Sequence, residues 1–519
     1  MDGFSTELFT TSLALIGVVV VVAALLSGLL ERSGLPQMAV LLGLGAALGP
    51  FGLDWLHVGL ESPSLRVLAT LSLALVLFTD ALSLDVREVG RRRGLAALLL
   101  GPGTLASAAL FAWLGWWLLD LSVPMAAIVG AALASTDPVL LRGLLRRPDL
   151  AGSARVGLRL ESGLNDAVLL PIVLVAMSLL QAREGAGSTD WAHLAMNLLV
   201  LSPGAGIVVG VFGISALDLV RRRVGVRRDY ESLYSLGICF SAFAAAEAVH
   251  GSGFLAAFAA GLTISAFDVE LCDCFKEYGE TTAELTLLFT FVLLGSSLIW
   301  SGIGEIGAAS LAFTALVLAG RPAIYLLALA GTDLDAKSRW WIAWFGPRGL
   351  SSLLLVLLPV FAGFSGGEAP FALVSLVVLC SVALHGGALM WLSEPTAGPP
   401  DPQRADVLIT TARVEELRAS GADVRFIDAR NEAAYNEASE SLVGALRLSL
   451  QSVADDARRL GLAKDAWLIA FCTCPADATS VRVAGDLKRA GFSRARALEN
   501  GWDAALAAGW PTERRPGGD

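Results

Sequence analysis

The stretch RVGLRLESGLNDAVLLPIVLVAMSLL, residues 155–180, decides the fold. It is long enough to cross a bilayer as one helix, because a helix needs about 20 predominantly apolar residues to do so. Two carboxylates, Glu161 and Asp166, nevertheless lie inside it. An ionisable side chain costs a few kcal/mol or more at the bilayer centre and marks a functional site there. We therefore expect a membrane-spanning helix that carries a functional group.

Outward from this helix, the chain keeps the same character as far as about residue 392. Its 519 residues are 55% hydrophobic and 17% charged, and the mean hydropathy of +0.65 excludes an ordinary soluble globular protein. No Lys or Arg precedes the first apolar stretch, which argues against a cleaved signal peptide. Apolar stretches of about 17 to 25 residues give about thirteen expected spans: 11–30, 36–53, 64–82, 96–119, 121–145, 155–180, 192–218, 232–249, 252–267, 284–300, 307–330, 340–361 and 370–392.

Positive charge gathers on one side of these spans. Loops on the cytoplasmic side of a membrane collect Lys and Arg. The odd-numbered loops and the span ends beside them hold about 17 such residues, whereas the even-numbered loops hold essentially one, Arg183. With an odd number of spans, this asymmetry predicts an N-terminus outside the cell and a cytoplasmic C-terminus.

Two of the expected spans contain helix breakers. Residues 136–138 (TDP) interrupt the fifth span, and residues 346–349 (GPRG) interrupt the twelfth. These positions correspond if spans one to six and eight to thirteen are inverted halves, as in many secondary transporters. Broken helices expose backbone carbonyls and helix ends that coordinate ions. The expected fold class is an all-α polytopic membrane protein with inverted repeats and crossed discontinuous helices.

Polar side chains share one face of the sixth span. The i, i+4 spacing puts Ser162 and Asp166 on one face, with Glu161 and Asn165 alongside. A hard cation prefers oxygen ligands, and an empty buried carboxylate takes up a proton because its charge is costly to bury. Competition of one cation and one proton for Asp166 is all that antiport requires. The expected cation ligands are Asp166, Ser162, Thr136, Asp137 and Asp80.

The same polar groups have a structural alternative, since polar residues often tie membrane helices together. We expect this for Glu161 and Arg348, whose opposite charges form an ion pair that holds the two broken helices in register. Asp137 is left open between cation binding and capping of a half-helix N-terminus. Asp80 lies near the end of a span, where water can reach it, so its participation is also left open. Asp166 is expected to be the carrier.

Four motifs across the first 390 or so residues resemble the bacterial cation:proton antiporters of the NhaP type, relatives of animal sodium/proton exchangers. They occur in the family's order and at its spacing. The sequence departs from the family at residues 77–82 (LFTDAL), where the carboxylate of Asp80 is displaced by about one position. The motifs are residues 135–138 (STDP), 161–166 (ESGLND), 251–256 (GSGFLA) with 260–262 (AGL), and 346–349 (GPRG).

This resemblance implies roles for individual residues. Asp166 carries the cation and the proton, Asn165 stabilises the site, and Thr136 and Asp137 lie where unwound helices cross. Glu161 is paired with Arg348 across two spans. The resemblance also implies a homodimer in the inner membrane of a bacterium, a role in pH homeostasis, and electroneutral exchange of one cation for one proton.

A second domain follows the membrane spans. The expected boundaries are 1–395 for the transmembrane domain, 396–402 for a linker and 403–519 for a cytoplasmic α/β domain, in which short apolar strands alternate with amphipathic helices. The segments 426–430 (FIDAR), 491–492 (GF) and 498–502 (LENGW) resemble a rhodanese-like domain.

A sulfurtransferase needs a reactive cysteine thiolate cradled by backbone amides. Cys472 and Cys474 are the candidate nucleophiles. Their loop lacks the Gly and Arg typical of the family, Asp477 adds the wrong charge, and Pro475 removes an amide donor. We therefore expect a regulatory or binding role for this domain.

The sequence thus predicts a secondary active transporter rather than an enzyme. It exchanges Na⁺, or Li⁺ or K⁺, for H⁺ and needs no cofactor, no metal beyond the transported cation and no nucleic acid. The alternative is a membrane-tethered sulfurtransferase whose spans serve as an anchor. About thirteen spans and several buried carboxylates are more than an anchor requires.

Overall fold

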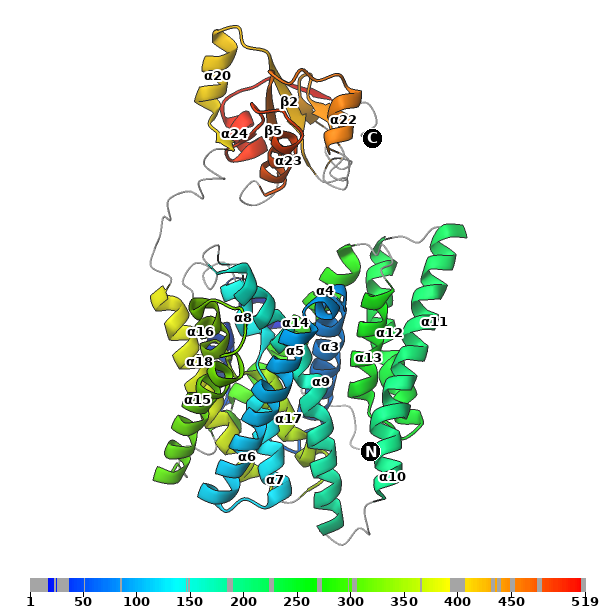
Figure 1. Ribbon diagram of the computed structural model, residues 1–519, viewed down its shortest axis with the longest axis vertical. Helices are drawn as coiled ribbons and strands as arrows, with labels where there is room; N and C mark the ends of the chain where they lie inside the picture. The colour runs from blue at the N-terminus through cyan, green and yellow to red at the C-terminus, as the bar shows by residue number, and fades with distance from the viewer. Residues whose placement is uncertain are drawn as a thin grey trace. The chain divides into compact units, whose positions relative to one another are not determined.

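The computed structural model contains two compact units, Met1–Ser393 and Glu394–Asp519. The first, called here the helical unit, consists of helices, and the second, the C-terminal unit, contains a β-sheet (Figure 1). The expected linker, 396–402, lies outside the described residues. The structure describes residues 17–514 except 23–24, 26–36, 51, 85, 146, 148–149, 184–189, 224–227, 268–272, 297, 301–305, 365, 393–406, 431–434, 436–439, 449–452 and 474–477.

The helices of the helical unit follow the predicted spans. Each of the twelve spans expected from residue 36 onward coincides with one helix or with consecutive helices. The first expected span, 11–30, lies largely outside the described residues, so the total of thirteen stays a prediction. The first half comprises α2 (Gln37–Leu48), α3 (Pro63–Ser83), α4 (Val86–Arg91), α5 (Arg93–Leu98), the π-helix η1 (Leu99–Leu105), α6 (Ala106–Leu119), α7 (Val123–Ala134), α8 (Pro138–Leu145) and α9 (Gly152–Arg183).

The second half continues in the same way. In the two halves together, the described residues include six helical segments that are long and apolar enough to cross a membrane, and five shorter apolar helices. The helices are α10 (Trp191–Met196), the π-helix η2 (Asn197–Leu201), α11 (Ser202–Arg223), α12 (Arg228–Ala248), α13 (Gly253–Ala266), α14 (Asp273–Ser296), the 3₁₀-helix η3 (Leu298–Trp300), α15 (Ala308–Ala328), α16 (Ala336–Trp344), α17 (Leu350–Phe361) and α18 (Glu368–Leu392).

Both predicted helix breaks are present. Helix α7 ends at Ala134 and α8 begins at Pro138, because proline lacks an amide donor and disfavours helical geometry in the preceding residue, yet fits the first helical position. Helices α16 and α17 are likewise separated by residues 345–349. The two breaks touch, since the amide of Asp137 donates to the carbonyl of Pro347 at 2.9 Å. The predicted crossing of discontinuous helices is thereby confirmed.

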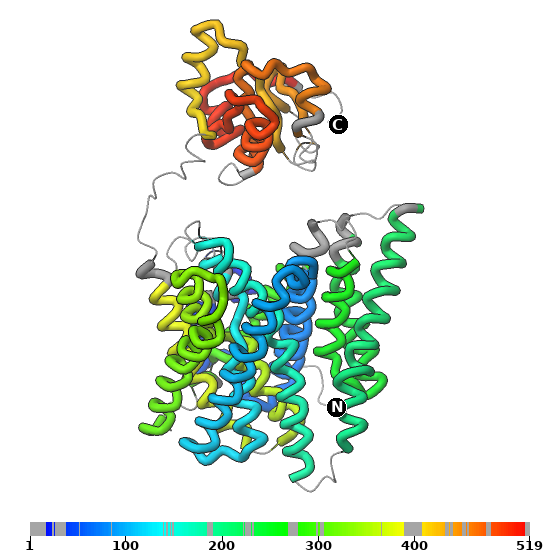
Figure 2. Tube along the Cα trace, in the orientation of Figure 1, coloured from blue at the N-terminus to red at the C-terminus, as the bar shows by residue number. Residues whose placement is uncertain are grey.

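Small residues bring the surrounding helices close together. Helix α7 packs on α6 and α9, while α11 and α12 pack on α13, which in turn packs on α3 (Figure 2). A Cβ at Gly130 of α7 would overlap the Ala108 carbonyl of α6. A Cβ at Gly206 of α11 would overlap the Ala256 carbonyl of α13. Close backbone approach of this kind favours helix association in a membrane.

The C-terminal unit is an α/β domain, as predicted. Its parallel sheet has the order β1-β6-β5-β2-β4, and β3 pairs with β7 separately. Alternate residues of β5 enter different cores, since Leu468 packs with α22 and α23 whereas Ile469 packs with α20 and α24. The elements are β1 (Leu408–Ile409), α20 (Thr411–Ala419), β2 (Val424–Asp428), β3 (Glu440–Leu442), β4 (Leu446–Arg447), α22 (Val453–Arg459), β5 (Trp467–Phe471), α23 (Ala478–Arg489), β6 (Arg496–Leu498), α24 (Gly501–Ala507) and β7 (Thr512–Arg514).

Candidate functional site

Asp166 lies on α9 beside both helix breaks. Its side chain is buried, with 4% of the residue exposed. The hydroxyl of Ser135, in the first break, donates to Asp166 Oδ1 at 2.6 Å. Ser351, in the first turn of α17, also interacts with this carboxylate. Ser162 is buried one turn earlier on α9. The site therefore places a carboxylate among hydroxyl groups from three helical segments, a set of hard oxygen ligands suited to a cation.

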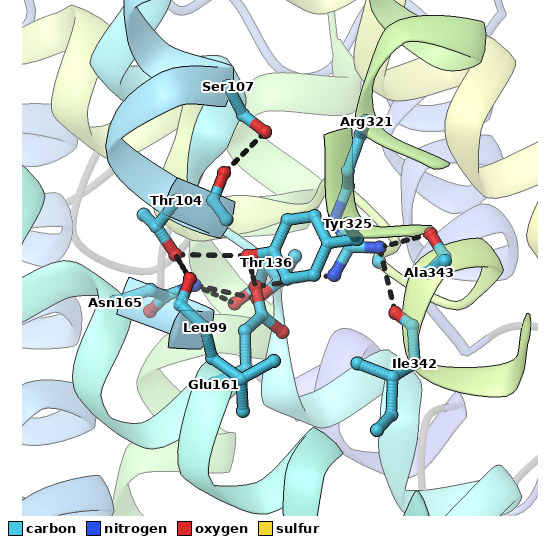
Figure 3. Close-up of polar contacts among 12 residues, drawn as sticks. Leu99, Thr104, Ser107, Thr136, Glu161, Asn165, Arg321, Tyr325, Ile342 and Ala343 are labelled. Carbon is cyan, nitrogen blue, oxygen red and sulfur yellow. Dashed lines mark hydrogen bonds and ion pairs between the residues drawn. The ribbon is translucent and has the colours of Figure 1, made fainter. Parts of the chain in front are cut away.

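Asn165, the residue before Asp166, is linked through Thr136 to a second buried carboxylate, Glu161 (Figure 3). Its amide Nδ2 donates to Thr136 Oγ1 at 2.6 Å, and the Thr136 hydroxyl donates to Glu161 Oε1 at 2.9 Å. All three residues are fully buried. The Asn165 Oδ1 atom is buried without a hydrogen-bond partner among the described residues. A buried acceptor in that condition is costly unless a ligand satisfies it.

The predicted partner of Glu161 was wrong. Glu161 forms its ion pair with Arg321 of α15, whose Nη2 lies 3.3 Å from Glu161 Oε1, rather than with Arg348. Arg321 Nη1 also donates to the carbonyls of Ile342 and Ala343 at 3.1 and 2.6 Å, at the C-terminal end of α16. A cation is favourable there because the last carbonyls of a helix carry partial negative charge.

Arg348 serves the other half-helix. Its Nε donates to the carbonyl of Leu133 at 3.0 Å, at the C-terminal end of α7, and its Nη1 donates to Gly346 at 3.0 Å. The guanidinium also lies over the ring of Phe111 at 5.6 Å. Each of the two broken helices thus ends against a different arginine. Both arginines are 1% exposed.

Asp137 caps the opposite broken helix. Its Oδ2 accepts a hydrogen bond from the amide of Leu350, the first residue of α17, at 2.8 Å. This is the capping role that the sequence left open, and it is exerted on α17, across the crossing of the two breaks. A Cβ at Gly349 would overlap Asp137 Oδ2, so only glycine leaves room for this cap. Asp80 lies half-buried near the end of α3, and its part in the site stays a prediction.

Four residues of the cluster were not assigned a role from the sequence, and one of them, Ser351, lies just after the second break. Ser135 directly precedes the predicted break, which was the available signal for it. Arg321 was recognisable as a charge within a span but not as the partner of Glu161. Tyr325 follows it by one helical turn, is 1% exposed, and donates to Glu161 Oε1 at 3.0 Å.

Of the two candidate cysteines of the C-terminal unit, the structure describes Cys472. Cys472 follows β5, is 2% exposed and takes part in a disulfide. Its sulfur lies 3.7 Å from Ser480 Oγ. Cys474 lies outside the described residues. A sulfur atom held in a disulfide has no thiolate with which to attack a substrate.

Several known proteins resemble the helical unit. The K⁺/H⁺ antiporter NhaP2 of Shewanella sp. (strain MR-4) is 27% identical over 376 residues, which are 71% of this chain and 64% of that protein. The chain thus spans less than two thirds of that relative's length. The Na⁺/H⁺ antiporter NhaG of Bacillus atrophaeus is 24% identical over 401 residues, covering 72% of this chain and 73% of that protein.

The fold is also found among solved structures. The sodium proton antiporter MjNhaP1 from Methanocaldococcus jannaschii at pH 8 matches with a TM-score of 0.60 and 20% identity, over 74% of this chain and 100% of that chain. A rhodanese-like domain from Anabaena sp. covers 21% of this chain at 22% identity, with a TM-score of 0.18. The family model described as "Sodium/hydrogen exchanger, transmembrane" matches residues 18–394. The chain therefore belongs to the sodium/hydrogen exchanger family.

Proposed function

We propose that this chain exchanges a monovalent cation for a proton, with both ions competing for the carboxylate of Asp166. The observation that carries the proposal is the buried carboxylate of Asp166. It accepts a hydrogen bond from the hydroxyl of Ser135, in the break between α7 and α8, and interacts with Ser351 of α17. With a cation bound, the carboxylate is ionised and compensated. When the cation leaves, a proton restores neutrality, because an isolated buried charge is costly.

The neighbouring residues complete a cation shell in this proposal. Asn165 Oδ1 is an acceptor without a protein partner among the described residues, and it lies on the residue next to the carrier. Ser162, Thr136 and Asp137 are further candidate ligands, and Asp80 an additional one from α3. The pairing of Glu161 with Arg321 leaves Asp166 as the group whose charge changes, which supports exchange of one cation for one proton without net charge movement.

The ion and the assembly are part of the same proposal. One relative is named for K⁺ and another for Na⁺, so both ions fit the family. We propose Na⁺ first, with K⁺ or Li⁺ as alternatives. We propose a homodimer in the inner membrane of a bacterium, with the N-terminus outside and the C-terminal unit in the cytoplasm. The asymmetry of Lys and Arg between the loops supports this orientation.

Competition at one site predicts a specific pH dependence. Proteoliposomes that contain the full chain and a pH-sensitive dye should show cation-driven proton flux. On the acid side, the apparent KM for the cation should rise by about tenfold per pH unit, by mass action, while the maximal rate is unchanged. A maximal rate that falls with pH at a constant KM would contradict competition. Flux that depends on the membrane potential would contradict electroneutral exchange.

For the C-terminal unit we propose a regulatory role. The burial and disulfide bonding of Cys472 support this over sulfur transfer. A chain that ends at residue 400 should still exchange ions, but with a shifted pH dependence. The full chain should transfer no sulfur from thiosulfate to cyanide. Turnover that disappears in a Cys472→Ser/Cys474→Ser double variant would instead support the sulfurtransferase alternative.

A further inference from the structure

A continuous row of buried hydrogen bonds leads from α15 to the carrier site (Figure 3). Thr104 Oγ1 lies 3.0 Å from the hydroxyl of Tyr325, and that hydroxyl donates to Glu161 Oε1 at 3.0 Å. From Glu161 the row continues through Thr136 to Asn165. Tyr325 thus stands three hydrogen bonds away from the residue adjacent to Asp166, without being part of the cation site.

The surroundings hold the Tyr325 ring in place. Thr104 belongs to the π-helix η1, which contains Pro102, and π-helical turns of this kind occur frequently at functional sites. The next residue back, Gly103, lies against the ring, since a Cβ there would be 3.0 Å from two ring carbons. Arg321, one turn before Tyr325 on α15, stacks its guanidinium over the ring at 4.2 Å. The hydroxyl is therefore aimed at Glu161 by packing on two sides.

The chemistry of the row fixes which way its protons point. Glu161 forms an ion pair with Arg321, and both Tyr325 and Thr136 donate to its Oε1 atom. Thr136 has then used its only hydroxyl proton and can only accept from Asn165. Asn165 must consequently turn its NH₂ group toward Thr136.

The position of the Asn165 Oδ1 atom follows from this order. Oδ1 points away from Thr136 and is left as a buried acceptor without a partner among the described residues. The two oxygens of Glu161 are not equivalent either. Thr136, Tyr325 and Arg321 all converge on Oε1, whereas Oε2 is buried without a hydrogen-bond partner in the described part of the chain. Loss of one donor to Oε1 therefore weakens the contacts that hold the Glu161 carboxylate in one orientation. Because Thr136 links Glu161 to Asn165, the orientation of the Asn165 amide is then less well fixed.

We propose that Tyr325 is a positioning residue for ion exchange: its hydroxyl locks the Glu161 carboxylate so that Thr136 and Asn165 present the Asn165 Oδ1 atom to the transported cation. The inference rests on the proposed function of Asp166. Tyr325 touches neither the cation nor the carrier. Its contribution acts on cation affinity, because loss of the lock leaves Asn165 divided between two amide orientations of which one offers a ligand oxygen.

The test is Tyr325→Phe in the full chain, measured in proteoliposomes with Na⁺, K⁺ and Li⁺ in turn. The phenyl ring keeps the packing against Gly103 and Arg321 and removes only the hydroxyl. We expect the apparent KM for the transported cation to rise about five- to tenfold, in line with the net contribution of one typical hydrogen bond, and the maximal rate to stay within about twofold. Because a cation that binds less tightly competes less well with protons, a lower proton concentration should inhibit the exchange. The acid limb of the pH profile should therefore move to higher pH.

Two further variants make the outcome decisive. Tyr234→Phe is the matched control, because that hydroxyl donates to the carbonyl of Gly213 at 3.0 Å on α11 and α12, away from the row; it should leave KM and the pH profile unchanged. Thr104→Val removes the other partner of Tyr325 and should raise KM in the same direction.

The results separate the possible failures. If Tyr325→Phe lowers thermal stability but changes neither KM nor the pH profile, its role is structural and the inference is overturned. If Tyr325→Phe does not reach the membrane, an unchanged KM in Thr104→Val overturns it equally. If Asp166→Asn still exchanges ions, the proposed function fails, whatever Tyr325→Phe shows.

Discussion

Replacing Asp166 by Asn is expected to abolish cation-driven proton flux, to less than about one hundredth of the unmodified rate. The amide has nearly the same shape as the carboxylate and can still accept the hydroxyl of Ser135. The amide can neither carry the negative charge that compensates a cation nor take up a proton when the cation leaves. Flux in proteoliposomes with an internal pH dye measures the effect.

Asp120→Asn is the matched control for this experiment. Asp120 is exposed at the C-terminal end of α6 and has a positive φ of 50°, a conformation that asparagine also adopts readily. This variant should exchange ions at the unmodified rate. Equal flux in Asp166→Asn and in the control would remove Asp166 as the carrier and, with it, the competition mechanism.

Removal of Arg321 is expected to have the largest effect on stability. Arg321 and Glu161 are 1% and 0% exposed, so Arg321→Met leaves a buried carboxylate without its counter-ion. Breaking a buried pair on one side typically costs about 3 to 5 kcal/mol. The Glu161→Gln/Arg321→Met double variant leaves neither side chain of the pair charged, so most of the lost stability should be recovered. Thermal melting of the purified full chain in detergent measures both.

An exposed ion pair provides the comparison. Arg425 and Asp423 in the C-terminal unit pair at 2.9 Å with 57% and 54% of their side chains exposed. Arg425→Met should therefore cost no more than about 1 kcal/mol. The assignment of Arg321 as the partner of Glu161 is contradicted if Arg321→Met lowers stability no more than Arg425→Met does. It is also contradicted if a double-mutant cycle with Arg348→Met shows a larger coupling energy to Glu161→Gln than the cycle with Arg321→Met.

Much of the fold was predictable because hydropathy and helix breakers are local properties. The spans from residue 36 onward match observed helices, and Pro138 and Pro347 mark the breaks in α7–α8 and α16–α17. The grouping of Glu161, Asn165 and Asp166 followed from helical spacing alone.

The arginine partner could not be obtained in the same way. Arg321 and Arg348 both lie in apolar spans, and apolar periodicity does not fix the rotation of a helix that is hydrophobic nearly all round. Which arginine meets Glu161 is decided by the carbonyl ends of α7 and α16, each of which attracts one guanidinium. The π-helix η1, which brings Thr104 to Tyr325, could not be predicted either, because one extra residue in a helical turn does not change the composition.

The cap that Asp137 places on α17 limits how the ion preference of this protein can be redesigned. Its backbone amide and one carboxylate oxygen, Oδ2, both bind the opposite broken helix, so a substitution there should destabilise the crossing before it alters ion selectivity. Three serine hydroxyls lie nearer the proposed carrier, Asp166, and that of Ser135 donates to the carboxylate itself. The other two belong to Ser162 and Ser351. An engineer who wants a larger or smaller ion to fit should begin with those hydroxyls and leave the aspartate alone.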